Sequence, residues 1–330
     1  MSSRKPAGRV PGYRRGPRTA ALAVLAAVAL LLAACSSSST SGGGTSTNTS
    51  SSSSPAAAGN GKSLTLGTKN FTEEFIIGAL YQLALQAKGY SVSYKPNIGA
   101  TEVIDKALTS GQIDAYPEYT GESVATVAGI TTTPATPQQE YNLAKAFYAK
   151  RGQSMSAMTP FFDTDAIAVT KAYAARYGLK TTADLTKIPH FTLGARPEFQ
   201  GRAEGAVGLE KVYGIHNFTF RSLALGLQYQ ALDSGAINAA DVFTTDPQLA
   251  SGKYVVLTDP KNIFGFQNIA LVINTSKLDQ LGSQTFLSII NRVNALLTTP
   301  AIIAMNKAVA IDKQQPADVA RAFLKANSVI

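Results

Sequence analysis

Apolar residues along positions 62–330 follow two alternating spacings. Short runs such as Leu64–Thr68 and Ala166–Thr170 are rich in apolar and β-branched residues, which is typical of buried strands. Between such runs, apolar residues recur three or four positions apart, as the pattern on one face of a helix requires. The first such series is Ile76, Ile77, Leu80, Leu83, Ala84 and Ala87. Because strands and amphipathic helices alternate, the pattern predicts an α/β fold.

The same reading extends along the chain. Further strands are expected at 92–95, 191–194, 218–220, 254–257 and 269–273. Helices are expected from about residue 70 to Gly89 and at 102–109, 138–151, 204–213, 284–297, 301–310 and 316–325. Asn70 is expected to cap the first helix, ahead of an acidic first turn that contains Glu73.

Two stretches, residues 107–120 and 231–244, align without a gap at a separation of 124 residues. In each, a helical run ends at Ser–Gly, a short apolar strand follows, and an aromatic residue and a threonine end the strand. In open α/β sheets, ligands collect outside the carboxyl ends of strands. We therefore predict that Tyr119–Thr120 and Phe243–Thr244 face a shared cleft. The alternative is that helix–turn–strand units are ordinary in α/β proteins, which explains Ser–Gly well and the matched aromatic–threonine pairs less well.

The folded part is too long for one comfortable core, so two lobes are expected. The order of the elements places residues 62–164 and 266–330 in lobe 1 and residues 165–265 in lobe 2. Two chain crossings, near Thr164–Asp165 and near Phe266–Gln267, would then let the lobes close on a ligand.

The N-terminus is typical of a targeting segment. A basic region precedes an apolar run from Ala20 to Leu32, too short for a confident membrane span and suited to a signal peptide over residues 1–34. Small residues before Cys35, the only cysteine, resemble a bacterial lipobox, so we predict cleavage before Cys35 and lipidation of its thiol. Residues 36–61 are almost entirely Ser, Thr, Gly and Ala, a composition that favours a flexible tether. We expect a protein anchored by lipid to the extracytoplasmic face of the cell membrane.

Charge and candidate chemistry narrow the function. The formal net charge is +9, but residues 1–34 carry six basic residues and no acidic one. The remainder holds 24 basic and 21 acidic residues, so a nucleic-acid partner is not expected. His190 and His216 are far apart, and no nucleophile elbow, P-loop, zinc-ligand spacing or dinucleotide fingerprint occurs. We therefore expect neither an enzyme nor a cofactor or metal.

Two basic residues are candidates for binding an anion. Lys69 lies between the first strand and the start of a helix, a favourable place for an anion, although a solvated lysine is equally consistent with this position. Arg202 lies in a loop between strand and helix and could clamp a carboxylate with two parallel hydrogen bonds. A surface ion pair with Glu198 or Glu204 is the alternative.

Four segments of the chain carry a family resemblance. They are Gly67–Glu73, Pro117–Gly121, Pro197–Arg202 and Phe243–Asp246. They resemble the extracytoplasmic substrate-binding proteins of ABC importers for glycine betaine, carnitine, choline and related osmoprotectants. The resemblance covers residues 62–330 and implies a two-lobed, type II periplasmic-binding-protein fold with the ligand cleft between the lobes. It also implies a membrane permease and its ATPase as partners.

The resemblance implies roles for single residues. In the family, a box of aromatic rings holds a quaternary ammonium by cation–π contacts, worth about 0.5 to 2 kcal/mol each. Lysine, arginine and hydroxyl groups hold the ligand carboxylate. By position, Tyr119 matches one ring of the box, and Lys69 and Arg202 match the carboxylate clamp.

Three positions depart from the family pattern. Asp165 stands where a ring is common, Phe243 stands where tyrosine is usual, and a further tyrosine is replaced by Phe264 or Phe266. Phenylalanine keeps a π face but loses the hydroxyl. Asp165, if it faces the cleft, would attract a cation by charge and repel a carboxylate. The leading hypothesis is therefore a receptor for a quaternary-amine osmoprotectant. The alternatives are a divergent pocket for another small cation or aromatic metabolite, and an envelope lipoprotein that serves as an interaction module.

Overall fold

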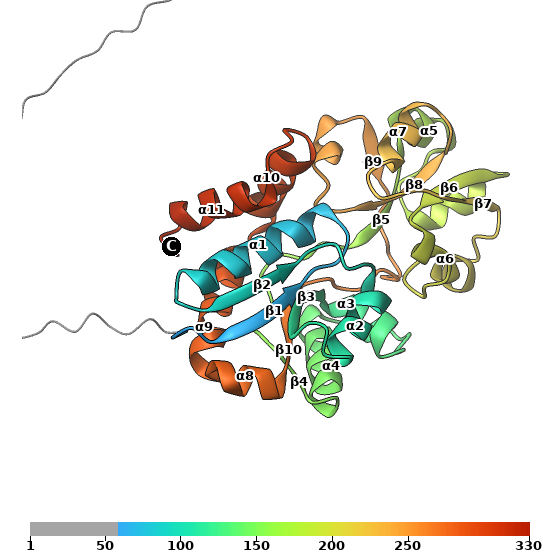
Figure 1. The fold of residues 1–330 in the computed structure, drawn as a ribbon. Coiled ribbons are helices and arrows are strands. Elements are labelled where there is room, and N and C mark those ends of the chain that lie inside the picture. The colour runs from blue at the N-terminus through green and yellow to red at the C-terminus, as the bar shows by residue number, and fades with distance from the viewer. Residues whose placement is uncertain (1–58) are drawn as a thin grey trace, which may run out of the picture. The chain divides into compact units, whose positions relative to one another are not determined.

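A computed structural model describes residues 59–330, which contain two five-stranded sheets (Figure 1). The predicted signal peptide, the predicted lipidation site at Cys35 and the linker up to residue 58 lie outside the described residues. We call each sheet with its helices a lobe. The α/β prediction is confirmed.

The first sheet has the strand order β2-β1-β3-β10-β4. Its strands are β1 (Ser63–Gly67), β2 (Ser91–Lys95), β3 (Ala115–Tyr119), β4 (Gln153–Met155) and β10 (Ile269–Asn274). Strand β1 pairs in parallel with β2 and β3, whereas β10 runs antiparallel to β3 and β4. The carboxyl ends of β1 and β3 therefore meet at one edge of this sheet.

The second sheet repeats this arrangement in the order β7-β6-β8-β5-β9. Its strands are β5 (Asp165–Thr170), β6 (Phe191–Ala195), β7 (Phe218–Ser222), β8 (Ala239–Phe243) and β9 (Tyr254–Val256). Strand β6 pairs in parallel with β7 and β8, and β5 runs antiparallel to β8 and β9. In both sheets, the antiparallel strand flanked by two others is the one that follows a chain crossing. The exact lobe limits predicted from the sequence stay a prediction.

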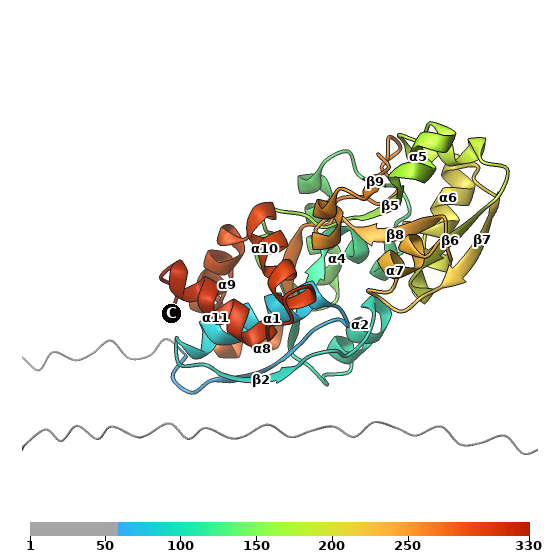
Figure 2. The same ribbon diagram turned by 90° about the horizontal axis from the view of Figure 1, so that it is seen from above.

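Helices cover both faces of the sheets. In the first lobe they are α1 (Thr72–Gln86), α2 (Thr101–Thr109), α3 (Thr120–Glu122), α4 (Pro137–Lys150), α8 (Thr275–Leu281), α9 (Ser283–Leu296), α10 (Thr299–Ala310) and α11 (Pro316–Ala326). In the second lobe they are α5 (Lys171–Tyr177), α6 (Ala206–Tyr213) and α7 (Gln228–Asp233). Helices α9, α10 and α11 lie beside α1 (Figures 1 and 2), and their buried apolar residues belong to the same core cluster as those of α1. This is why the end of the chain belongs to the same core as its first helix.

The first helix differs from the prediction at its start. Helix α1 begins at Thr72, with Phe71 as the residue before its first turn, and no side chain caps it. The expected cap from Asn70 was wrong, because Asn70 lies one residue too early. Sequence patterning also missed β4, α5 and α8, which are three to seven residues long and therefore too short to show a period. None of the described helices is by itself long and apolar enough to cross a membrane, although α9 and α10, bent by 87°, meet that requirement together.

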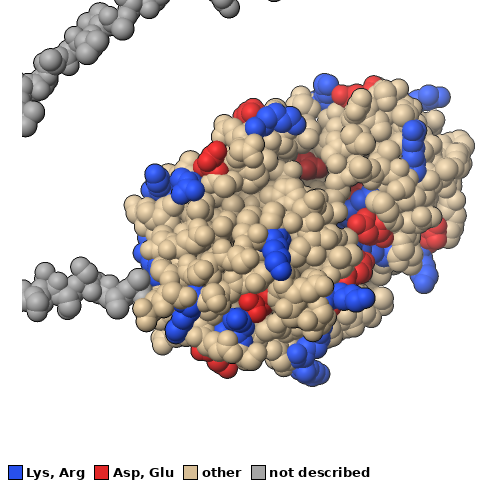
Figure 3. All heavy atoms as spheres, viewed as in Figure 1, with Lys and Arg blue, Asp and Glu red and all other residues tan. Residues whose placement is uncertain are grey.

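Charged side chains of both signs are interspersed on the face shown in Figure 3, where neither sign covers a large patch. This distribution agrees with the small net charge of the chain after residue 34. Six buried charged residues lie instead together, in the lining of one pocket.

Candidate ligand-binding site

A pocket lies where the carboxyl ends of strands from both sheets meet. Its lining includes Lys69, Phe71, Thr101, Tyr119, Glu122, Asp163, Asp165, Arg196, Glu198, Arg202, Phe243 and Gln267. Five of the predicted site residues are in this set, namely Lys69, Tyr119, Asp165, Arg202 and Phe243. The pocket position follows from the topology, because parallel strands direct their carboxyl ends to one edge of a sheet.

Three aromatic rings form one wall of the pocket. Tyr119 ends β3, Phe243 ends β8, and Phe71 lies just before α1. The ring of Phe71 lies 5.8 Å from that of Tyr119 and 5.3 Å from that of Phe243, between their centroids. Rings from both lobes thus lie together, and their π faces suit a cation. Sequence reasoning did not nominate Phe71, although it lies within one of the segments that carry the family resemblance.

The hydroxyl of Tyr119 is held by a buried acid. It donates to Oε1 of Glu73 at 2.9 Å. The other oxygen, Oε2, accepts from Oγ1 of Thr245 at 2.6 Å and from Nδ2 of Asn306 at 2.8 Å. Burial raises the pKa of Glu73, although these hydrogen bonds oppose the rise. Glu73 therefore ties a pocket ring of the first lobe to a residue of the second.

Lys69 lines the pocket and is 3% exposed. Its Nζ pairs with the carboxylate of Glu118 and lies 4.9 Å from the centroid of the Tyr119 ring. Burial raises the pKa of Glu118, and Lys69 opposes that rise. The ammonium group predicted to hold a ligand carboxylate therefore has a carboxylate partner within the protein.

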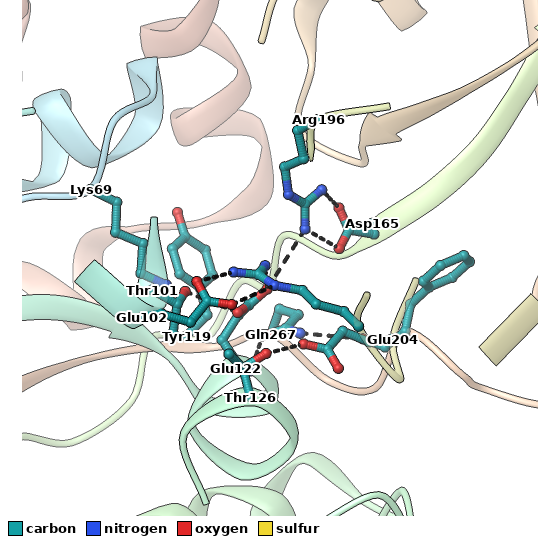
Figure 4. Close-up of polar contacts among 12 residues, drawn as sticks. Lys69, Thr101, Glu102, Tyr119, Glu122, Thr126, Asp165, Arg196, Glu204 and Gln267 are labelled. Atoms are coloured by element: carbon teal, nitrogen blue, oxygen red, sulfur yellow. Dashed lines mark hydrogen bonds and ion pairs between the residues drawn. The ribbon is translucent and has the colours of Figure 1, made fainter. Parts of the chain in front are cut away.

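Arg196 is a pocket cation that the sequence reasoning did not nominate. Its Nη1 and Nη2 donate to the two oxygens of Asp165 at 2.5 and 2.8 Å (Figure 4). Nη1 also donates to Asp241 at 2.7 Å. The guanidinium group lies 5.3 Å from the centroid of the Phe243 ring. Asp165 does line the pocket, but its charge is paired with Arg196 rather than free to meet a ligand.

Arg202 joins the two lobes. Its Nη1 donates to Oε1 of Glu122 at 2.7 Å, and its Nη2 and Nε donate to the two oxygens of Glu102 at 2.9 and 3.2 Å. The expected alternative partners, Glu198 and Glu204, are not the ones it contacts, and Arg202 is buried rather than on the surface. Arg202 comes from the loop after β6, whereas both glutamates belong to the first lobe.

Glu122 was not nominated from the sequence, yet it is the most highly connected acid of the pocket. Besides Arg202, it accepts from Oγ1 of Thr101 at 2.9 Å, and it lies 3.7 Å from Nη2 of Arg196 (Figure 4). Its backbone N–H donates to Oε1 of Gln267 at 3.0 Å. Burial acts to raise its pKa, but Arg202, Lys69 and Arg196 together lower it to about 2. The only signal in the sequence is its place three residues after Tyr119.

The remaining nominated residues lie beside the pocket and not in its lining. The hydroxyl of Thr120 donates to the carbonyl of Phe266 at 2.7 Å, and that of Thr244 donates to Asp163 at 3.1 Å. Both threonines therefore fasten the chain crossings. The backbone N–H of Phe266 donates to Glu140 at 2.6 Å, and Phe264 packs against Phe199 in the core of the second lobe.

The residues that the structure describes contain no group of His, Cys, Asp and Glu suited to a metal ion. The arrangement that they do form combines three aromatic rings with a set of paired charges, and two of those charges, on Lys69 and Arg196, lie beside the rings of Tyr119 and Phe243. Such a site provides binding contacts for a small polar cation.

Comparison with known proteins gives a consistent result. Residues 62–326 match the family model described as the substrate-binding domain of ABC-type glycine betaine transport systems. A glycine-betaine-binding protein of Pseudomonas aeruginosa is 30% identical over 282 residues, which are 82% of this chain and 89% of that protein. An ergothioneine transport permease and binding protein of Helicobacter pylori, EgtU, is 29% identical over 269 residues, or 80% of this chain. This chain spans only 47% of that longer relative.

Solved structures agree with the sequence comparisons. A crystal structure of a glycine betaine/carnitine/choline ABC transporter has a TM-score of 0.65 and 25% identity, and covers 81% of this chain and 99% of that one. A choline-binding protein in complex with choline has a TM-score of 0.60 at 14% identity, which shows a shared fold. The family predicted from the four segments is confirmed. The chain belongs to the family of substrate-binding domains of ABC-type glycine betaine transport systems.

Proposed function

We propose that this chain is the extracytoplasmic receptor of an ABC importer for a quaternary-amine osmoprotectant such as glycine betaine, carnitine or choline. The observation that carries the proposal is the aromatic wall of Phe71, Tyr119 and Phe243. A quaternary ammonium has no N–H to donate, so π faces and acids are the groups that recognise it. Each desolvated ring contributes about 0.5 to 2 kcal/mol.

The origin of the rings supports ligand-driven closure. Tyr119 belongs to the first lobe and Phe243 to the second, so a ligand between them contacts both. A ligand shifts an equilibrium only if it binds one state better than the other. Contacts from both lobes supply this difference, because the opened form would keep only one set. The closed receptor would then deliver the ligand to a membrane permease driven by a cytoplasmic ATPase.

The anchor belongs to the same proposal. Cleavage before Cys35 and lipidation of its thiol would hold the domain at the outer face of the membrane, near its permease. The Ser- and Thr-rich stretch after Cys35 would serve as the tether. Metabolic labelling with a fatty acid, compared between the native chain and Cys35→Ala, tests the anchor separately from ligand binding.

Calorimetric titration of the purified chain tests the binding proposal. The panel is choline, glycine betaine, carnitine and ergothioneine, the last because of the name of the Helicobacter relative. At least one quaternary amine should bind, and Phe243→Leu should weaken its binding by about 2- to 30-fold, the equivalent of one ring. Phe218→Leu is the matched control, because Phe218 packs on Phe191 away from the pocket. No heat from any quaternary amine, or equal losses in both variants, would contradict the proposal.

A further inference from the structure

We propose that Glu122 sets the specificity of the site, by supplying from within the protein the carboxylate that a zwitterionic ligand would otherwise bring to Arg202. The site would then select a quaternary amine without a carboxylate, the choline class, over a betaine. This inference rests on the proposed function, since it concerns the same pocket.

The first argument is the use of the Arg202 donors. Three of its N–H groups point to protein carboxylates, one to Glu122 and two to Glu102. The pairing with Glu102 is bidentate and uses two parallel N–H donors of Arg202, the geometry in which an arginine would otherwise bind a ligand carboxylate. Glu122 occupies the pocket side of the same guanidinium group, since it lines the pocket and is 7% exposed. A ligand carboxylate that approached Arg202 from the pocket would therefore meet the carboxylate of Glu122 beside it.

The second argument is that Glu122 is held in place. Thr101 donates to one of its carboxylate oxygens, and Gln267 accepts from its backbone N–H. Its other oxygen faces Arg202 and lies within 3.7 Å of Arg196 (Figure 4). Partners on three sides fix the side chain against rotation out of the pocket. Its pKa of about 2 agrees with a carboxylate that stays ionised at neutral pH.

The third argument is the charge balance of the lining. The basic residues that line the pocket are Lys69, Arg196 and Arg202, and each is paired with at least one protein carboxylate. The acidic residues that line it are Glu122, Asp163, Asp165 and Glu198. Added negative charge from a ligand would therefore meet four acids, and no basic residue of the lining that lacks a carboxylate partner. The same acids would attract the positive charge of a quaternary ammonium that lies on the aromatic wall.

Choline and glycine betaine make a sharp test, because they share the trimethylammonium group and differ in a hydroxymethyl group against a carboxylate. Both are titrated into the native chain, Glu122→Gln and Glu102→Gln by calorimetry at neutral pH. Glu122→Gln keeps the shape and removes the charge. Glu102→Gln is the matched control, because Glu102 also pairs with Arg202 but does not line the pocket, and its own side chain is 52% exposed.

The native chain should bind choline at least about tenfold more tightly than glycine betaine. Glu122→Gln should lower that ratio by about tenfold or more, with glycine betaine gaining and choline losing, whereas Glu102→Gln should leave it within about threefold. A native preference for glycine betaine, or an unchanged ratio in Glu122→Gln, overturns this inference and leaves the proposed function standing. Failure of choline and glycine betaine to bind the native chain overturns this inference, and only failure of the whole panel of quaternary amines overturns the proposed function as well. The native ratio needs no variant, so the inference stays testable if Glu122→Gln does not fold.

Discussion

The two stretches that align in the sequence, residues 107–120 and 231–244, also form equivalent units in the structure. In each, a glycine of positive φ lies in the turn that connects a helix to the following strand. The φ angle is 76° at Gly111 and 71° at Gly235. An oxygen of Asp114 accepts from the backbone N–H of Thr65 at 2.7 Å. Asn238 makes the same contact with Thr192 at 2.8 Å, in the second lobe. The units therefore share their connections to the neighbouring strand as well as their backbone path.

The units diverge just after their shared threonine. Glu122 and Asp246 stand at equivalent positions, three residues beyond Tyr119 and Phe243 respectively. Glu122 faces two arginines of the other lobe, and its pKa falls to about 2. Asp246 accepts from Tyr229 at 2.7 Å, and burial raises its pKa to about 6. A repeated scaffold thus places an acid twice, and the groups around each acid decide the direction in which its pKa shifts.

The largest expected effect is an opposite pH dependence of these two acids. The folded-state pKa of Glu122 lies below its ordinary value of 4.5, so its stabilisation is present above pH 4.5 and is lost as the pH falls towards 2. The part of the free energy of unfolding that depends on the ionisation of Glu122 is on the order of 3 kcal/mol. The folded-state pKa of Asp246 lies above its ordinary value of 3.8, so stability falls as the pH rises from about 4 to about 6.

Denaturant unfolding as a function of pH checks this prediction. In Glu122→Gln, the decrease in the free energy of unfolding between pH 4.5 and pH 2 should be smaller than in the native chain. In Asp246→Asn, the decrease between about pH 4 and about pH 6 should be smaller. Taking each variant as a difference from the native chain removes the contribution of the other buried acids. If the difference in the free energy of unfolding from the native chain changed with pH in the same way for both variants, the two acids would titrate alike, contrary to this prediction.

The next effect concerns Glu73, which connects the ends of both units. Glu73→Ala leaves the hydroxyls of Tyr119 and Thr245 and the amide of Asn306 without their shared acceptor. We expect a loss of about 2 to 3 kcal/mol in the free energy of unfolding. Because burial favours the protonated acid, Glu73→Gln should cost clearly less. Equal losses in the alanine and glutamine variants would mean that the hydrogen bonds are not what Glu73 contributes.

A smaller effect tests whether the units are equivalent. Gly111→Ala and Gly235→Ala each force a Cβ into the left-handed region, and neither new methyl group has an atom within 4 Å. The cost is therefore backbone strain alone, about 1 to 2 kcal/mol at each site. Thermal or denaturant unfolding should give equal losses for the two variants. A clear inequality would show that one turn carries a constraint that the other lacks.

The sequence predicted the scaffold well because the scaffold depends on local patterns. The Ser–Gly turns, the strands that follow them and the rings of Tyr119 and Phe243 could be read from residue spacing and placed at one edge of each sheet. Arg196 and Glu122 could not be assigned in this way, because their partners lie in the other lobe or on other strands. The pairing of Asp165 with Arg196 changes the role of both and depends on a contact between residues 31 positions apart.

The smallest expected effect concerns the one hydroxyl by which the two pocket rings differ. Tyr119→Phe makes the first ring match Phe243, removing the bond to Glu73 and leaving the π face in place. Stability should fall by about 1 kcal/mol, the value of one hydrogen bond, while ligand affinity changes by less than about threefold. Calorimetric titration and denaturant unfolding of the same preparation separate the two quantities. Tyr119→Leu is the control, because it also removes the ring and should weaken binding about as much as Phe243→Leu. If Tyr119→Phe weakened binding as much as Tyr119→Leu, the hydroxyl network would be recognising the ligand, and the two rings would not be equivalent.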